Sequence, residues 1–293
     1  MKSDLESDLN SAKKYIYVFI NNMQISKISY QPFFGTSYRK VYKSDKPYLL
    51  DHEASTCCFK NDYLWNKSFD FFIDKYRFID NVNVYSLASS DCSEALSIAM
   101  ILDTKLGSES EKYFPIYAVD SDEGVLENIR NGFIDLAPDD EVRINHYTNN
   151  NLNKYLRRTS YSYLSGRIGD TDNRKLLTRF IINPELLKKI KVICDDVNTY
   201  TDSLPAKNNL IFSRNMWVYM HPKQNEYLHK LSNIADENSF LSIGNYDYLM
   251  CPLTIKNTEG FSMHPELINV YDKSGSNYFD DWSLFAAAQM KDY

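Results

Sequence analysis

The sequence predicts an α/β fold with a doubly wound, mostly parallel sheet, a small N-terminal helical cap and a small inserted subdomain. Two observations carry this prediction. Residues 82–133 show the pattern of strand, turn, amphipathic helix, strand and helix, and the same alternation returns between residues 191 and 243. Strands and helices that alternate in this way build a parallel sheet with helices on both faces.

Composition bounds the class of protein before any motif is considered. The chain has 293 residues, of which 43% are hydrophobic, and a net charge of −6. A chain of this length can bury a full core without metal or disulfide support. The mild acidity argues against a broad nucleic-acid-binding surface. Five cysteines without a CxxC pair argue against a zinc site or a disulfide framework. We therefore expect neither a nucleic-acid partner nor a metal site.

The first part of the chain, residues 1–75, is expected to form the N-terminal helical cap. Five apolar residues recur there at helical spacing: Leu5, Leu9, Ala12, Ile16 and Phe19. A second helix, near the end of this region, should lie against the sheet through Leu64, Phe71, Phe72 and Tyr76. No apolar stretch near the N-terminus is long enough for a signal peptide or a membrane span. This predicts a cytoplasmic protein without membrane insertion.

The strands and helices of residues 82–133 point to a nucleoside-cofactor site. The first strand is a short extended run that includes Val82, Val84 and Ser86 to Ala88, and a helix with apolar residues at i, i+3, i+4 and i+7 follows. The second strand ends at Asp120, and Asp122 can cap the next helix, whose inward face is expected to include Phe133. An acid after the second strand of such a sheet can accept both hydrogen bonds from a ribose diol. The first turn has no glycine, so a capped turn in an ordinary α/β protein is the alternative interpretation.

The second half of the chain completes the predicted sheet. Residues 134–190 are polar and interrupt the alternation, which indicates an insertion. Four later segments are then expected to be regular, namely strands at 191–194, 208–213 and 239–243 and a helix from Pro222 to Ala235. A further strand is expected at 267–271. The predicted domains are therefore the cap at 1–75, the main domain at 76–275 with its insertion, and a C-terminal tail at 276–293.

Several separated segments resemble one family, the CheR-type S-adenosylmethionine-dependent methyltransferases, which esterify glutamate side chains on chemotaxis receptors. The matching segments are VYSLASSDCSEALSIAM (84–100), IYAVDSDEGVLENIRNG (116–132), IINPELLKKIKVICDDVN (181–198) and LIFSRNMWVYM (210–220). A further segment, STCCFK (55–60), is similar to the T-x-F-F-R motif that closes over the cofactor in this family. The resemblance implies a Rossmann-like methyltransferase sheet, S-adenosylmethionine as the cofactor, and a protein substrate such as a chemoreceptor or another signalling protein. It also implies that the insertion corresponds to a small β-subdomain that can bind a receptor peptide by strand addition.

The resemblance also assigns roles to individual residues. Six are expected to bind the cofactor: Thr56, Ala88, Glu94, Asp120, Asn198 and Asn215. Among these, Glu94 matches a carboxylate for the amino group of the cofactor, and Asn198 falls where an acceptor for the adenine amino group is needed. Three residues are expected to hold the substrate carboxylate: Lys60, Arg214 and Tyr219. Thr56 and Asn215 are also common turn residues, and Tyr219 is one of 23 tyrosines.

Departures from the family pattern leave alternative functions open. Ala88 and Cys92 replace glycines, Lys60 replaces the arginine of T-x-F-F-R, and Asp247 ends a segment that is G-H-S-E in the family. An ammonium group lacks the planar donor fork of a guanidinium group. The primary hypothesis is methyl transfer to a glutamate carboxylate. The alternatives are a weakened or inactive protein that binds the cofactor as a sensing or interaction module, and an enzyme that acts on a small molecule.

Overall fold

The computed structural model describes residues 39–42, 52–61, 64–165, 176–220, 223–244, 247, 260–264, 266–267 and 269–273. The chain divides into two compact units, Met1–Thr36 and Ser37–Tyr293, and every described residue belongs to the second. Three sequence predictions lie outside the described residues: the helix in the first 23 residues, the helix start at Pro222 and the tail at 276–293.

A seven-stranded sheet forms the centre of this unit, with the strand order β11-β12-β10-β9-β3-β4-β8. Neighbouring strands from β10 to β8 are parallel, whereas β12 runs antiparallel to both β10 and β11. The strands are β3 (Asn83–Leu87), β4 (Ile116–Asp120), β8 (Ile190–Cys194), β9 (Asn209–Ser213), β10 (Phe240–Ile243), β11 (Ser262–Met263) and β12 (Val270–Asp272). The predicted doubly wound fold is confirmed. The last strand begins at Val270 rather than at Leu267, because Asn269 adopts a left-handed conformation with a φ of 55°.

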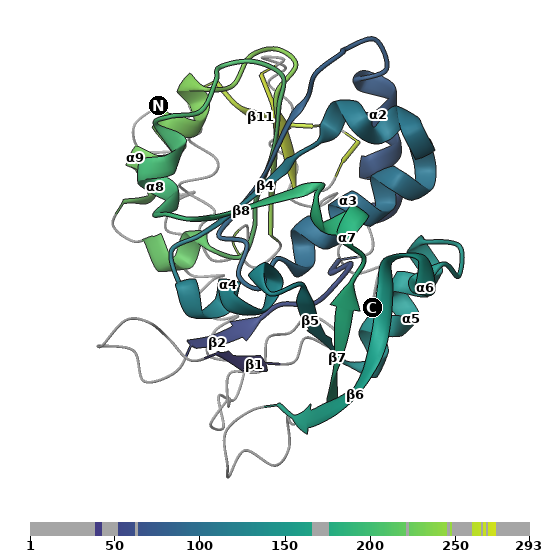
Figure 1. Ribbon diagram of the computed structural model, residues 1–293. Coiled ribbons are helices and arrows are strands. Elements are labelled where there is room, and N and C mark those ends of the chain that lie inside the picture. Colours follow the sequence, from purple (N-terminus) through teal and green to yellow (C-terminus); the bar gives the residue numbers. More distant parts are fainter. Residues whose placement is uncertain are drawn as a thin grey trace, which may run out of the picture. The chain divides into compact units, whose positions relative to one another are not determined.

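Helices cover both faces of the sheet (Figure 1). Successive side chains of a strand point to opposite faces. Leu210 and Phe212 of β9 join the core beneath one set of helices, while Ile211 joins the core on the other face. The first face packs against η1 (Leu64–Ser68), α2 (Phe69–Lys75) and α3 (Ser93–Leu106), and the second against α8 (Val197–Thr201) and α9 (Gln224–Asn233). The predicted helix carrying Phe72 and Tyr76 does pack on the sheet, since both side chains are buried.

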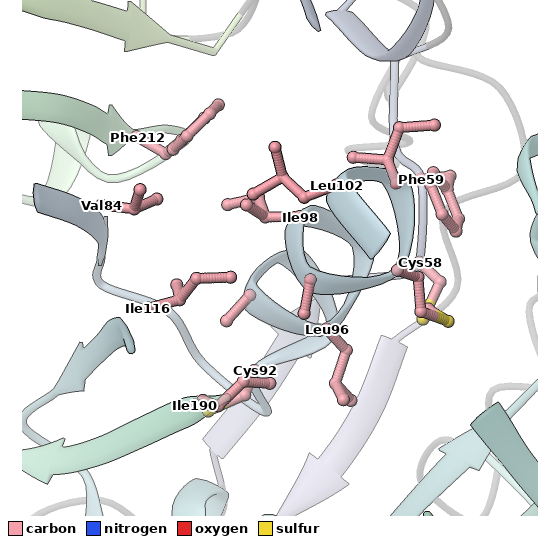
Figure 2. Close-up of a cluster of buried hydrophobic side chains, with 14 of the residues drawn as sticks. Cys58, Phe59, Val84, Cys92, Leu96, Ile98, Leu102, Ile116, Ile190 and Phe212 are labelled. Carbon is pink, nitrogen blue, oxygen red and sulfur yellow. The ribbon is translucent and has the colours of Figure 1, made fainter. Parts of the chain in front are cut away.

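The α3 helix lies between the sheet and the segment at residues 56–61. Figure 2 shows Ile98 and Leu102 on the side of the helix toward Val84 and Phe212, with Cys58 and Phe59 on the other side. The backbone N–H of Phe59 donates to the Ser97 hydroxyl across 2.8 Å. This segment is therefore fixed against the side of α3 that faces away from the sheet.

The inserted region contains its own antiparallel sheet, with the order β5-β7-β6. Its elements are β5 (Phe133–Leu136), α5 (Pro138–Tyr147), α6 (Leu152–Tyr155), β6 (Leu156–Leu164) and β7 (Leu176–Ile182), with α7 (Pro184–Leu187) leading back to β8. Phe133 was expected on the inward face of the preceding helix, and this was wrong. The helix ends at Arg130, and Gly132, with a φ of 77°, turns the chain so that Phe133 begins β5.

The remaining elements are connections. They are the paired strands β1 (Arg39–Tyr42) and β2 (His52–Ser55), the 3₁₀ turns η2 (Gly107–Tyr113) and η3 (Trp217–Met220), and the helix α4 (Glu123–Arg130). The predicted cap of α4 is confirmed, because the Asp122 carboxylate accepts the N–H of Gly124. Within the described part of the chain, no helix is long and apolar enough to cross a membrane.

Candidate active site

The strand order reverses between β3 and β9. From β3 the chain adds β4 and β8 on one side of β3, and it later adds β9 and β10 on the opposite side of β3. Ligands of doubly wound sheets bind beyond the carboxyl ends of the strands at such a reversal. Most of the predicted site residues follow β3, β4, β8 or β9 at this edge. The topology therefore brings together residues that are far apart in the sequence.

The turn between β3 and α3 has a backbone that usually requires glycine. Ala88, Ser90 and Cys92 all adopt left-handed conformations, with φ values of 55°, 51° and 63°. Such conformations are unfavourable for residues that carry a Cβ atom. Local bonds hold the turn in this shape, because the Asp91 carboxylate accepts both the N–H and the hydroxyl of Ser93 at 3.1 and 2.6 Å. The chain thus keeps a glycine-type turn at Ala88 without glycine.

Asp120 ends β4 and faces this turn. One carboxylate oxygen accepts the Ser90 N–H at 2.7 Å, and the other accepts the Asp122 N–H at 3.0 Å. A carboxylate oxygen has two lone pairs and can therefore accept more than one hydrogen bond. The buried Ser90 hydroxyl, which has no hydrogen-bond partner among the described residues, belongs to the same turn. Sequence reasoning did not predict Ser90, although its place in the turn opposite Asp120 was available as a signal.

Asn198 lies in the short helix α8 that follows β8. Its amide nitrogen donates to Glu226 of α9 at 3.2 Å, which orients the side chain. Its amide oxygen is buried and accepts no hydrogen bond within the described part of the chain. A buried acceptor without a donor is costly, and the amino group of an adenine would supply that donor. The side chain therefore fits the role predicted for Asn198.

A buried ion pair links α3 to the end of β9. The side chain of Arg214 is 1% exposed, and it donates to the Glu94 carboxylate at 2.8 Å. The same guanidinium group donates to the side chain of Asn61 at 2.5 Å and to the carbonyl of Lys60 at 3.4 Å. Ser86 donates to the other oxygen of Glu94 at 3.0 Å. Glu94, predicted to bind the amino group of the cofactor, thus forms an ion pair with Arg214 in this structure.

Lys60 belongs to the segment that packs on α3. The Trp65 indole donates to the Lys60 carbonyl at 2.9 Å, and Arg143 fixes the same segment by donating to the Cys58 carbonyl at 2.9 Å. Burial lowers the pKa of the Lys60 ammonium group below its usual range, and the nearby positive charge of Arg214 lowers it further, while Cys57 and Glu94 act in the opposite direction. Lys60 and Arg214 are therefore near each other in a poorly solvated site.

The turn after β9 is held by an acid that the sequence did not identify as functional. The buried carboxylate of Asp247 accepts the N–H groups of Asn215, Trp217 (2.9 Å) and Gly244 (3.2 Å). Asn215 is left-handed, with a φ of 59°. A Cβ atom at Gly244 would lie 2.4 Å from the Asn215 amide oxygen, so only glycine fits there. The available signal was an acid three residues after the glycine that ends a strand.

Two predicted residues are less closely joined to this cluster. Tyr219 is 82% exposed, and no interaction among the described residues connects its side chain to Lys60 or Arg214. Thr56 is partly buried just before the segment that carries Lys60. The structure thus brings Lys60, Glu94 and Arg214 together, whereas Tyr219 could reach a substrate only from the solvent side.

Comparisons with known proteins now decide the family. Residues 55–261 match the family model described as CheR methyltransferase, SAM binding domain. The chain belongs to the CheR methyltransferase family. It is therefore an S-adenosylmethionine-dependent methyltransferase with a Rossmann-like fold, as the sequence predicted.

The other comparisons add little to this assignment. The crystal structure of precorrin-6y C5,15-methyltransferase from Geobacter metallireducens GS-15 is similar over 71% of this chain and 75% of that chain, with 9% identity and a TM-score of 0.34. A similarity at this level carries no argument about function. No curated protein matches the sequence.

Proposed function

We propose that this CheR-family enzyme transfers the methyl group to a carboxylate, namely a glutamate side chain of a protein such as a chemoreceptor or another signalling protein. The observation that carries the proposal is the placement of two cations, Lys60 and Arg214, in one poorly solvated cluster. Their mutual repulsion contributes to the lowered pKa of Lys60. An incoming carboxylate would add a negative charge between them and relieve that repulsion.

The cofactor would lie along the turns already described. S-adenosylmethionine supplies an electrophilic methyl group, and its transfer leaves S-adenosylhomocysteine. Asp120 is suited to accept hydrogen bonds from a ribose, and the buried oxygen of Asn198 is suited to accept one from the adenine. Asn215 lies beside the end of β10, and Thr56 precedes the segment that would cover the cofactor. These roles remain proposals for the individual residues.

The acceptor chemistry requires little proton transfer. A glutamate carboxylate is already ionised at pH 7, so the site does not need a general base. Lys60 and Arg214 would orient the carboxylate, and exclusion of water would raise the reactivity of its oxygen. The edge strand β6 of the inserted sheet, most of whose side chains are exposed, supports a protein acceptor, because an extended peptide can add to such an edge.

The test uses labelled S-adenosylmethionine and receptor-type peptides that carry glutamate, with glutamine peptides as the control. Lys60→Ala should reduce methyl-ester formation by roughly 1 to 3 kcal/mol, because a charge-assisted hydrogen bond is lost. Lys60→Arg should increase it, because a guanidinium group orients a carboxylate better. Since the pKa of Lys60 is lowered, the parent should lose activity at alkaline pH earlier than Lys60→Arg does.

The contrary outcome is also defined. If neither the parent nor Lys60→Arg labels any glutamate peptide, while calorimetry shows that S-adenosylhomocysteine binds, the glutamate acceptor is wrong. Transfer of label to a small carboxylic acid would then favour an enzyme that acts on small molecules. Cofactor binding without any transfer would favour a sensing or interaction module.

A further inference from the structure

We propose that Asp247 is a positioning residue, whose ionised carboxylate holds the Arg214–Asn215 turn in the shape that methyl transfer requires. The proposal rests on the function proposed above, because it assigns Arg214 a role in that reaction. It starts from the geometry of one buried side chain. Asp247 is fully buried, and its two oxygens accept the N–H groups of Asn215, Trp217 and Gly244.

These N–H groups lie just beyond the ends of two different strands. Asn215 and Trp217 follow β9, and Gly244 follows β10. The carboxylate therefore ties the turn that begins at Arg214 to the neighbouring strand. Because a left-handed Asn215 packs directly on Gly244, a small shift of either chain would be resisted by that contact. Asp247 thus fixes the backbone next to Arg214 through the N–H groups of Asn215 and Trp217. Glu94 and Asn61 fix the position of the Arg214 guanidinium group.

The charge state of Asp247 matters for this role. Backbone N–H groups donate all three hydrogen bonds to the carboxylate. A proton on either oxygen would therefore face an N–H group, and both would be donors. Burial raises the pKa of Asp247 to about 7, although the three N–H groups and the positive charge of Arg214 act in the opposite direction. Among the described residues, Lys60 and Tyr227 also interact with it electrostatically. Because this pKa lies above that of a solvated carboxyl group, the closed turn binds the proton more tightly than an opened turn would, so a fall in pH below about 7 should not open it.

The substitutions separate this role from simple packing. Asp247→Glu keeps the carboxylate and restores the acid that the resemblance places here, whereas Asp247→Asn keeps the size but replaces one acceptor oxygen with a donor. Asp247→Ala removes both acceptors. We expect methyl transfer to fall about a hundredfold in the alanine and asparagine variants. The glutamate variant should recover most of the loss.

A second measurement keeps the test independent of the acceptor. Hydrogen exchange at the amides of Asn215 and Trp217 reports directly on the turn, and S-adenosylhomocysteine can be present throughout. Asp247→Ala and Asp247→Asn should lose at least about tenfold protection at both amides, as expected when buried hydrogen bonds are removed. The parent should keep its protection as the pH falls through about 7, because the raised pKa makes the closed turn the form that binds the proton more tightly.

The two possible failures are distinguishable. If no peptide is methylated by the parent but the exchange results appear as expected, the glutamate acceptor is wrong and the hold of Asp247 on the turn stands. If the variants exchange like the parent at both amides, or if Asp247→Asn transfers methyl groups as fast as the parent, the positioning role is wrong. Thermal unfolding checks that each variant is folded, and exchange in Asp247→Asn serves as the test if Asp247→Ala does not fold.

Discussion

The turns after β3 and β9 lie on neighbouring parallel strands, and in each an acid about thirty residues later in the chain accepts backbone N–H groups. The turn after β3 is stabilised mainly by short-range bonds, such as those from Asp91 to Ser93, and by Asp120 on the adjacent strand. The turn after β9 depends on Asp247, which lies about thirty residues later in the chain. Both turns contain left-handed residues other than glycine. The comparison indicates that a left-handed turn without glycine is held in both places by a distant acid, which binds one N–H group of the first turn and two of the second.

The difference has a consequence for how each turn tolerates change. The turn after β3 takes only one N–H bond from its distant acid, so it should depend less on that acid. The turn after β9 takes two such bonds from Asp247 and should depend on it more. Arg214 joins the two regions, because it begins the second turn and binds Glu94 in the first turn of α3.

The largest effect is expected at this link. Arg214→Ala removes the partner of the buried Glu94 carboxylate, and breaking such a pair costs about 3 to 5 kcal/mol. The free energy of unfolding, measured with denaturant, should fall by that order, and methyl transfer should be lost. Arg214→Lys is the matched control, because it keeps the charge but loses the planar fork. An alanine variant as stable as the parent would contradict the view that this pair joins the two turns.

Asp120→Ala should act on the first turn alone. It releases the Ser90 N–H and removes the proposed acceptor for a ribose, so S-adenosylhomocysteine should bind more weakly by about 1 to 3 kcal/mol. Calorimetric titration measures the change, and Asp122→Ala is the control, since it should weaken the α4 cap by about 1 kcal/mol without changing the affinity. Equal affinity for Asp120→Ala and the parent would show that the cofactor is placed wrongly. Protection of the Asn215 amide should remain unchanged in both variants.

The smallest effect is expected for Ala88→Gly. Glycine adopts the left-handed conformation without the steric cost paid by alanine, and the larger entropy of its unfolded state offsets part of the gain. The net change in the free energy of unfolding should be a stabilisation of up to about 1 kcal/mol. Ala118→Gly, in the buried interior of β4, should instead destabilise. If both glycine variants destabilise equally, the turn at Ala88 is not strained.

The parts of the fold that were predictable are those with a local periodic signal. The β3, α3, β4 and α4 elements follow from apolar spacing and from the cap at Asp122, and the acid at Asp120 follows from its place after a strand. The prediction that Phe133 lies on the inward face of the helix α4 was wrong, because Gly132 turns the chain into the strand β5 of another sheet.

The contacts of the site were less predictable for a physical reason. Asp247 binds only backbone N–H groups, which every residue but proline offers, so no side-chain pattern marks its partners. The amide of Asn198 is oriented by Glu226 on a helix that comes later in the chain. Pairing Glu94 with Arg214 required the strand order, which places β3 beside β9 although the two side chains are 120 residues apart.

The cluster of Arg214, Glu94 and Asn61 also bears on the order in which parts of the site form during folding. Its hydrogen bonds span 120 residues to Glu94 and 153 residues to Asn61, and contacts between such distant segments form only after long loops have closed. Before β9 docks beside β3, a growing chain can already contain the β3–α3–β4–α4 unit with Asp120 in place. It cannot yet contain the hydrogen bonds from Arg214 to Glu94 and Asn61. The proposed acceptor site would thus be completed later in folding than the turn proposed to bind the ribose.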